Sequence, residues 1–252
     1  MAHQAGPLRL KGQLGGLSFY HHRQYGYLVR QKGGPDKELV ATSPQFARTR
    51  ENAAEFSIAA AAGRLIRQAA RSLSGLRGDS NVSQRLTGLL IRMGKTDLTS
   101  IRGMRNPAIV FNNSDSRALL QSFAFFAGRP LSGIYSGRIT CDIAAGSIVL
   151  VNDTSGTPAP ANEFFRAPKG ATHVQIKAAI ATLDFDKRRY HVFPAPSYTT
   201  YLENTLSPIS FTCELTTADS GFRIGIVAIE FLQEKNGELY GLADGMSLGI
   251  VG

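Results

Sequence analysis

The sequence predicts an α+β protein with an N-terminal β-hairpin arm, a basic helical region and a C-terminal antiparallel β-sandwich. Three observations support this class. Apolar and polar residues alternate within the first forty positions, apolar residues recur at helical spacing from Phe46 to Leu73, and short β-like runs separated by turn residues follow Ile134. The predicted parts are the arm at 1–40, the helical region at 41–106 and the sandwich-like domain at 107–252.

The arm is predicted from strand-like runs separated by breaker residues. Its segments are a strand at Leu8–Leu14, a break at Gly15-Gly16, a strand at Leu17–Tyr20, a turn at His21–Gln24, a returning strand at Tyr25–Arg30 and a stop at Gly33–Asp36. An isolated two-stranded hairpin is only marginally stable in water. We therefore expect the arm to pack on its own chain or on a neighbouring copy.

Two helices are predicted next. Ser43 before Pro44 is a helix-start signal, because a hydroxyl can cap the first turn and proline lacks only an N–H that has no partner there. The first helix is rich in alanine, which permits close approach by another helix or another copy, and Gly75 ends it. The second opens at Asn81 and has an apolar stripe from Val82 to Met93.

Short β-like runs dominate the last part of the chain. Those beyond Ile134 are Ile134–Ile143, Ser147–Val151, Glu163–Arg166, His173–Leu183, Arg189–Phe193, Ile209–Leu215, Phe222–Gln233 and Leu239–Val251. Ala108–Phe111 is predicted as a further short strand, and Leu119–Phe126 is ambiguous between helix and strand. Asn236-Gly237 between two apolar runs favours a type I′ hairpin. We expect a fragment starting near residue 130 to fold alone.

The basic residues are concentrated in the N-terminal part. The 252 residues carry a net charge of +9; residues 1–110 hold 17 Lys+Arg against 6 Asp+Glu, and residues 111–252 hold 11 against 13. This asymmetry favours a polyanion or an acidic patch of another copy as partner, although a solvated basic face is an equal alternative. The candidate contacts for nucleic acid or an acidic partner are Arg23, Arg30, Arg64, Arg67, Arg71, Arg85 and Arg92.

Aromatic residues of the arm give a second set of candidates. Tyrosines beside arginines and histidines can stack on bases, but packing within the protein is the favoured interpretation. The candidate assembly contacts are Leu17, Phe19, Tyr20, Tyr25 and Tyr27.

No catalytic or cofactor signature emerges from the sequence. Gly88–Thr96 has five residues between its glycines where a phosphate-binding loop needs four. His21-His22 has no third metal ligand nearby, and Asp184, Asp186 and His191 suit a polar turn better than a catalytic group. We therefore expect no enzyme activity, no cofactor, no metal site and no small-molecule substrate.

Composition, the lack of long apolar runs and the two cysteines bear on where the protein is found. Hydrophobic content of 43% and charged content of 19% indicate a globular chain. No run of about 18 apolar residues exists and no secretory signal is evident, so we expect no membrane span and a place in the cytoplasm or in an assembled particle. Cys141 and Cys213 are expected to be buried in strands rather than paired.

Three stretches together resemble a known group of proteins. They are Lys11–Tyr20, Phe46–Phe56, and the pair Ala167–His173 with Ile229–Gly237. These resemble uncharacterised hypothetical proteins of similar size from Bacteroidota bacteria, over most of the chain. The resemblance implies a single architectural unit and carries no activity, cofactor or site residue.

The expected function is a non-enzymatic structural building block of a homomeric assembly: a ring, tube, filament or shell of the kind found in virions and phages. A basic part of one copy can meet a neutral-to-acidic part of the next in a head-to-tail arrangement. A nucleic-acid-binding protein is the alternative. A ligand- or carbohydrate-binding β-sandwich is the third hypothesis.

Overall fold

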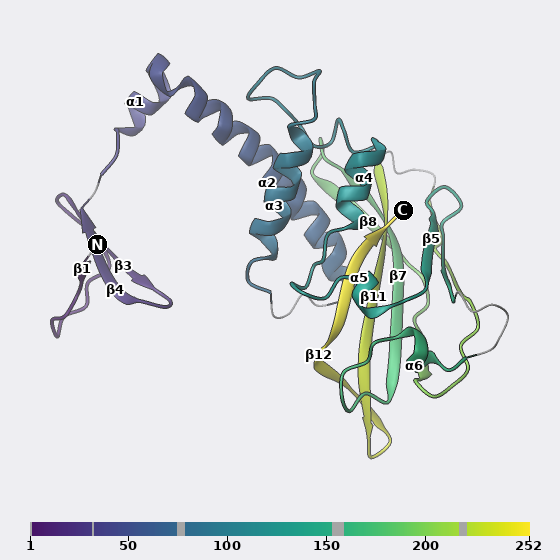
Figure 1. Ribbon diagram of the computed structural model, residues 1–252. Helices are drawn as coiled ribbons and strands as arrows, with labels where there is room; N and C mark the ends of the chain where they lie inside the picture. The colour runs from purple at the N-terminus through teal and green to yellow at the C-terminus, as the bar shows by residue number, and fades with distance from the viewer. Residues whose placement is uncertain (1, 32, 75–78, 153–158, 217–220) are drawn as a thin grey trace. The chain divides into compact units, whose positions relative to one another are not determined.

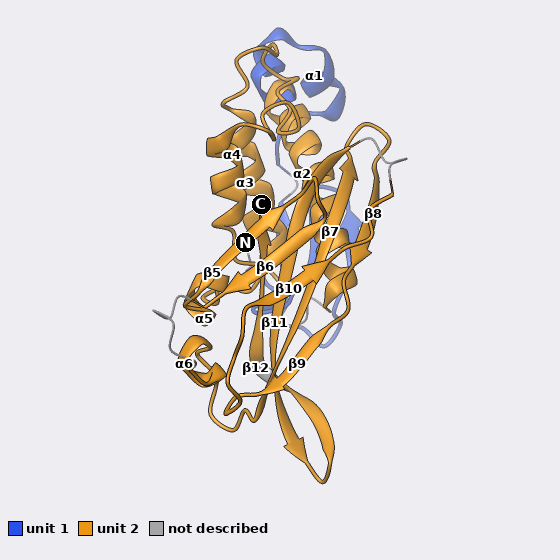
Figure 2. Ribbon diagram, turned by 90° about the vertical axis from the view of Figure 1, so that its right-hand side faces the viewer, with its two compact units in different colours: residues 1–50 blue, residues 51–252 orange. Residues whose placement is uncertain are grey.

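The computed structural model describes residues 2–31, 33–74, 79–152, 159–216 and 221–252. Helices and antiparallel sheets both occur, which confirms the α+β class (Figure 1). The chain divides into two compact units, residues 1–50 and residues 51–252 (Figure 2). The predicted boundary between residues 106 and 107 lies inside the second unit, because helices and strands there share one core.

The first unit contains a four-stranded antiparallel sheet in the order β1-β4-β3-β2. Its strands are β1 Ala2–His3, β2 Gly12–Leu14, β3 Leu17–His22 and β4 Gly26–Gln31. Gly15 has a φ of 55° between the paired residues Leu14 and Leu17, so the glycine pair forms a two-residue hairpin loop rather than a simple break. The Gln4 side chain bonds the carbonyls of Leu10 and Leu28, which joins the first residues to the sheet.

A helical segment ends this unit. It consists of α1 Lys37–Thr42, a 3₁₀ turn Pro44–Phe46 and the start of α2 Ala47–Leu73. Pro44 opens the turn as predicted, but the Ser43 hydroxyl makes no capping bond. Instead, Arg50 Nη1 donates to the carbonyls of Val40 and Ser43, both at 2.8 Å, and so satisfies backbone groups left by α1.

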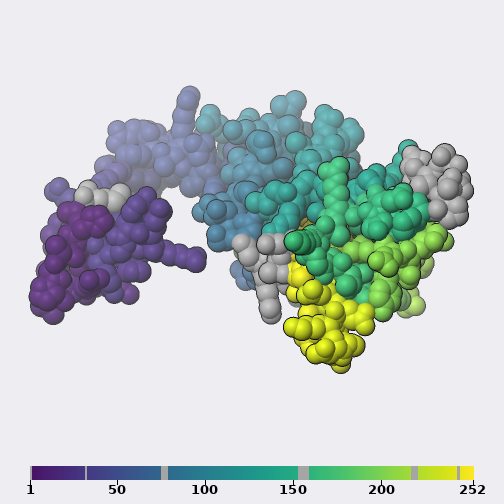
Figure 3. Space-filling model, turned by 60° about the horizontal axis from the view of Figure 1, so that its bottom comes forward, coloured from purple at the N-terminus to yellow at the C-terminus, as the bar shows by residue number. Residues whose placement is uncertain are grey.

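The second unit is organised around a five-stranded antiparallel sheet in the order β12-β11-β7-β8, with β9 also paired to β7. Its strands are β7 His173–Asp184, β8 Arg189–Pro194, β9 Tyr198–Tyr201, β11 Phe222–Lys235 and β12 Glu238–Val251. Asn236 and Gly237 have φ values of 55° and 81° between β11 and β12, which agrees with the predicted hairpin. This hairpin comes forward, in yellow, in Figure 3.

A smaller antiparallel sheet packs on one face of the large one (Figure 2). Its order is β10-β6-β5, with β5 Arg138–Asp142, β6 Ser147–Val151 and β10 Ile209–Thr212. Ile148 and Phe211 from the small sheet share a buried cluster with Ile176 and Val227 from the large one. Side chains on alternate strand positions therefore form the core between the two sheets.

Helices cover the opposite face of the large sheet (Figure 1). They are α2, α3 Val82–Gly94 and α4 Ser114–Gln121, with short helices α5 Leu131–Ile134 and α6 Ala161–Phe164 elsewhere in the unit. A Cβ at Gly63 would meet Leu90 Cδ1 at 3.2 Å, so glycine permits the close approach of α2 to α3. Ala181 and Ile226 of the sheet join this helical cluster.

Several local predictions were wrong. The arm strand expected at Leu8–Leu14 covers only Gly12–Leu14, and His21 and His22 end β3 rather than forming the turn. Ala108–Phe111 forms turns instead of a strand, with Val110 and Phe111 buried in the core shared by the helices and the large sheet, where the Phe111 ring contacts Phe185 and Phe222. Of the expected strand at Glu163–Arg166, the first two residues lie in α6 and only Phe165 forms a β-bridge, to Tyr135. Gly75, the predicted helix end, lies outside the described residues, and α2 ends at Leu73.

Candidate functional site

Residues 1–50 expose six large hydrophobic side chains, of which Leu14 and Leu17 lie in the strands. Leu28 is the one hydrophobic residue buried below a tenth of its surface among the described residues of this unit, at 5% exposed, whereas Leu8 is 81% exposed. The other large hydrophobic residues exposed in this unit are Leu10, Leu14, Leu17, Tyr25 and Leu39. We call this set the arm surface. Water contact with exposed apolar area is unfavourable, so the arm surface is a candidate interaction surface.

The other predicted assembly residues are half-buried, and cations cover two of their rings. Phe19, Tyr20 and Tyr27 are half-buried. Arg9 lies over the Tyr27 ring at 5.1 Å, and Arg30 over Tyr20 at 5.7 Å. Such cation–π contacts use the ring faces that bases would need.

Two further predicted residues lie on or beside these strands. His22 stacks on Tyr25 with ring centroids 4.8 Å apart, and Arg23 is exposed in the turn that follows. The geometry of these tyrosines favours internal packing over base stacking.

A second exposed apolar surface lies in the loop between α3 and α4. Leu98 is 90% exposed, and Ile101 and Met104 follow at three-residue intervals, also exposed. We call these three residues the loop surface. Glu55 Oε1 accepts a hydrogen bond from Gly103 N at 2.8 Å, and Glu51 forms an ion pair with Arg102 at 3.1 Å. These bonds hold the loop to α2, so its apolar side chains project from a fixed backbone.

Asp97 is the buried anchor of this loop. Its carboxylate is 1% exposed and accepts bonds from Thr99 N, Thr99 Oγ1 and Ser100 N through Oδ1, and from Asn106 N through Oδ2. Hydrogen bonds from Ser100 and Thr99 outweigh burial and hold the pKa of Asp97 well below its usual range. An ionised carboxylate therefore fixes the loop backbone.

The predicted basic row on α2 is present. Arg64 and Arg71 are exposed, and Arg67 between them is partly buried with its Nε unbonded within the described residues. Burial, followed by repulsion from Arg71 and Arg64, lowers the pKa of Arg67. No carboxylate of the described residues forms an ion pair with these three arginines, so the row carries concentrated positive charge.

A groove of about 720 Å³ runs beside this row and the start of β8. Its polar lining comes from Arg64 and Gln68 on α2 and from Arg188, Arg189, Tyr190 and His191 beside the sheet edge. Ala60 and Ala61 leave the space open because their side chains are small. Sequence reasoning missed the contribution of Arg188 and Arg189, since only the fold brings the β7–β8 turn next to α2.

Arg85 and Arg92 have different environments. Arg85 forms an ion pair with Asp79, donates to the carbonyls of Ala124 at 2.8 Å and Phe125 at 3.0 Å, and lies over the Phe123 ring. Its guanidinium thus joins α3 to the segment after α4, which corrects its assignment as a surface contact. Arg92 is exposed on α3.

The weak chemical motifs resolve into structural features. Gly88–Gly94 is part of α3, so the glycine-containing stretch is no phosphate loop. Asp184 accepts a bond from Lys187 N at 2.8 Å in the β7–β8 turn, and this bond lowers its pKa. In the described part of the chain, no group of three or more His, Cys, Asp or Glu side chains is arranged to hold a metal.

The two cysteines are free thiols in the second unit. Cys213 is buried and Cys141 is half-buried. Burial raises the pKa of the Cys141 thiol to about 11, so the nucleophilic thiolate is disfavoured at neutral pH.

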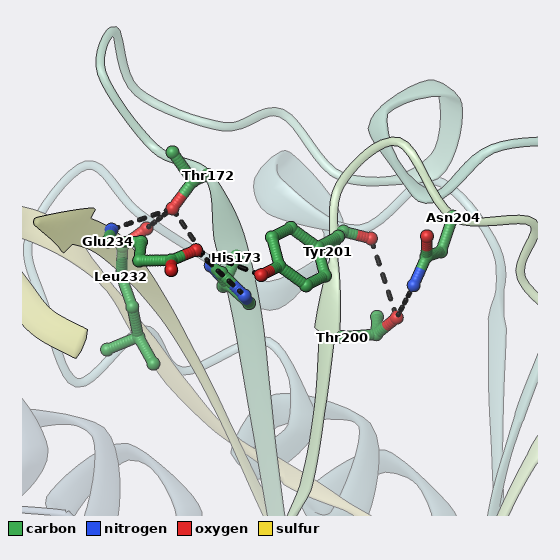
Figure 4. A network of polar contacts seen from close by, with 7 residues as sticks. All are labelled: Thr172, His173, Thr200, Tyr201, Asn204, Leu232 and Glu234. Atoms are coloured by element: carbon green, nitrogen blue, oxygen red, sulfur yellow. Dashed lines mark hydrogen bonds and ion pairs between the residues drawn. The ribbon is translucent and has the colours of Figure 1, made fainter. Parts of the chain in front are cut away.

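One polar network has no counterpart among the sequence-based predictions (Figure 4). Buried His173 packs against the Tyr201 ring at 3.8 Å, and Thr172 Oγ1 lies 2.9 Å from His173 Nδ1. Thr172 Oγ1 also accepts a bond from Glu234 N at 2.8 Å, and Tyr201 donates to Glu234 at 2.9 Å. The network links β7, β9 and β11, and these residues are too far apart in sequence to form a recognisable motif.

None of the helices formed by the described residues is long and apolar enough to span a membrane.

The chain was compared with protein-family models, with curated proteins and with solved structures. None of them matches it.

Proposed function

We propose that the chain is a non-enzymatic structural building block of a homomeric assembly. In this assembly, the arm surface of one copy packs on the loop surface of the next copy. The observation that carries the proposal is the exposure of the arm surface: among the described residues of 1–50, one hydrophobic residue is buried while six large ones are exposed. Contact of this apolar area with water is unfavourable, so its burial against a partner stabilises the unit.

Another copy is the partner that these surfaces favour. The chain carries two separate exposed apolar surfaces, one in each unit, so a row of identical copies can use both. A contact between two different surfaces of identical copies is head-to-tail, and such a contact closes into rings or extends into filaments.

Light scattering on purified, nuclease-treated protein tests the proposal. The full chain is expected to form assemblies, whereas deletion of residues 1–34 should leave a monomer with unchanged circular dichroism beyond the loss of the arm. The double substitution Leu98→Ser/Ile101→Ser should have the same effect. Leu239→Ser/Tyr240→Ser, a matched pair of exposed apolar residues outside both surfaces, should leave assembly intact.

Mixing two defective variants gives a sharper test of polarity. The deletion variant retains the loop surface, and the Leu98→Ser/Ile101→Ser variant retains the arm. Their mixture should form one-to-one dimers that cannot grow, because each partner supplies one half of a single contact. A monomeric full chain, assembly without the arm, or a mixture that stays monomeric would each contradict the proposal.

A further inference from the structure

We infer that the groove between α2 and the start of β8 binds single-stranded nucleic acid. Its residues all belong to the second unit, so the inference is independent of assembly through the arm. Arg188 and Arg189 lie in this groove together with Arg64 of the basic row on α2, so positive charge lines it on two sides.

Three arginines of the groove lining have no counter-charge among the described residues. Arg64, Arg188 and Arg189 are exposed, and within the described part of the chain their guanidiniums form no hydrogen bond or ion pair. Among the described residues, no carboxylate lines the groove. Three arginines without counter-charges around one hollow suit phosphate groups, because each bound phosphate releases condensed counterions.

The positive charge continues beyond the groove along the helix. Arg67 and Arg71 extend the row that starts at Arg64, over roughly 10 Å of helix axis. One phosphate group cannot span this length. The ligand that matches both the groove and the row is therefore a chain of phosphates rather than a single anion.

An aromatic side chain favours a single strand over a duplex. Tyr190 lines the groove beside Arg189 and is 37% exposed. Its ring can stack on an unpaired base, whereas bases of a duplex are already stacked on one another. Unlike Tyr20 and Tyr27 of the arm, Tyr190 has no arginine or lysine over its ring among the described residues.

The backbone at Arg188 is consistent with a functional position. Arg188 has a φ of 53°, the left-handed region in which glycine or asparagine is more stable than arginine. The turn therefore holds a strained arginine where a glycine would fit without cost, and this arginine lines the groove. Strain of this kind is concentrated at functional sites.

Fluorescence anisotropy of the full chain tests the inference. The probe is a labelled oligothymidylate of about 20 nucleotides, which is longer than the site of one single-strand-binding fold. Arg64→Ala/Arg189→Ala should weaken binding at least about tenfold and reduce the salt slope by roughly 0.7 for each phosphate that the variant no longer neutralises. Arg48→Ala/Arg92→Ala, which removes the same charge from exposed positions outside the groove, should weaken binding less than about threefold.

Three further variants separate stacking from charge and binding from folding. Tyr190→Leu should weaken single-strand binding about fivefold or more without changing the salt slope, and Tyr190→Phe should restore it. Arg188→Gly should weaken binding while raising thermal stability, which shows that the weaker binding is not due to unfolding. Undetectable binding at low salt, equal weakening in the control pair, or equal affinity for duplex of the same length would overturn the inference.

Discussion

The Glu55 carboxylate on α2 accepts a hydrogen bond from the backbone N–H of Gly103, 2.8 Å away and 48 residues later in the sequence. This bond attaches the loop surface to the longest helix. Gly103 has a φ of 91°, and a Cβ there would lie 3.2 Å from Glu51 Cγ and 3.3 Å from Glu51 Cα. Glycine is therefore required by both the backbone conformation and the close approach to α2.

A pair of glycine substitutions tests this requirement. Gly103→Ala should lower the free energy of unfolding by about 1–3 kcal/mol, because alanine is strained at that φ and crowds Glu51. Gly88→Ala is the matched control: Gly88 lies on the exposed side of α3 with nothing within 4 Å of an added Cβ, so stability should rise by about 0.5–1 kcal/mol. Urea unfolding measures both values. Equal effects of the two substitutions would contradict the requirement for glycine at position 103.

Asp97 predicts a pH dependence of stability. The pKa of Asp97 is lower in the folded protein than in the unfolded chain, where it is about 3.9. Its contribution to the free energy of unfolding is therefore complete above the unfolded pKa and is lost as the pH falls through the folded pKa. Asp97→Asn should cost about 2 kcal/mol at neutral pH, since the amide accepts fewer and weaker bonds. Unfolding of both proteins between about pH 7 and pH 3 should show this penalty shrinking below about pH 4. A penalty that stays constant with pH would show that the charge of Asp97 is unimportant.

Arg85 and Arg92 make a second matched pair. Arg85→Met should destabilise the protein by about 2 kcal/mol, because it leaves the carbonyls of Ala124 and Phe125 and the Asp79 carboxylate without their shared donor. Arg92→Met, at an exposed position on the same helix, should change stability by less than about 0.5 kcal/mol. Thermal or urea unfolding distinguishes them. A nucleic-acid-binding defect in Arg85→Met with unchanged stability would instead restore Arg85 as a surface contact.

The two units predict which fragments fold. A fragment of residues 107–252 lacks α2 and α3, which cover Ala181 and Ile226 on one face of the large sheet. It should therefore aggregate or bind the dye ANS, contrary to the sequence-based expectation for a fragment starting near residue 130. A fragment of residues 51–252 retains both helices and should give cooperative unfolding. A cooperatively folded 107–252 fragment would show that the helices are dispensable.

The local signals in the sequence were sufficient for most of the secondary structure. Apolar runs bounded by turn residues located β7, β11 and β12 to within a few residues, and Asn236-Gly237 located the hairpin because few other residues adopt positive φ. The failures have a physical cause. Ala108–Phe111 is apolar because Val110 and Phe111 are buried in the core shared by the helices and the large sheet, and a short buried turn has the same composition as a strand.

The α+β class, the two long helices, the order of the C-terminal strands and the basic row on α2 follow from the sequence alone, because each depends on residues close together in the chain. The shared core of these helices and the large sheet emerges only from tertiary packing, since β11 is apolar on both faces and its pattern does not specify what covers each one. Tertiary contacts also place the Arg85 guanidinium in hydrogen bonds within the chain, and they bring Arg188 and Arg189 beside Arg64. Such long-range placement depends on the packing of whole elements, which no local pattern encodes.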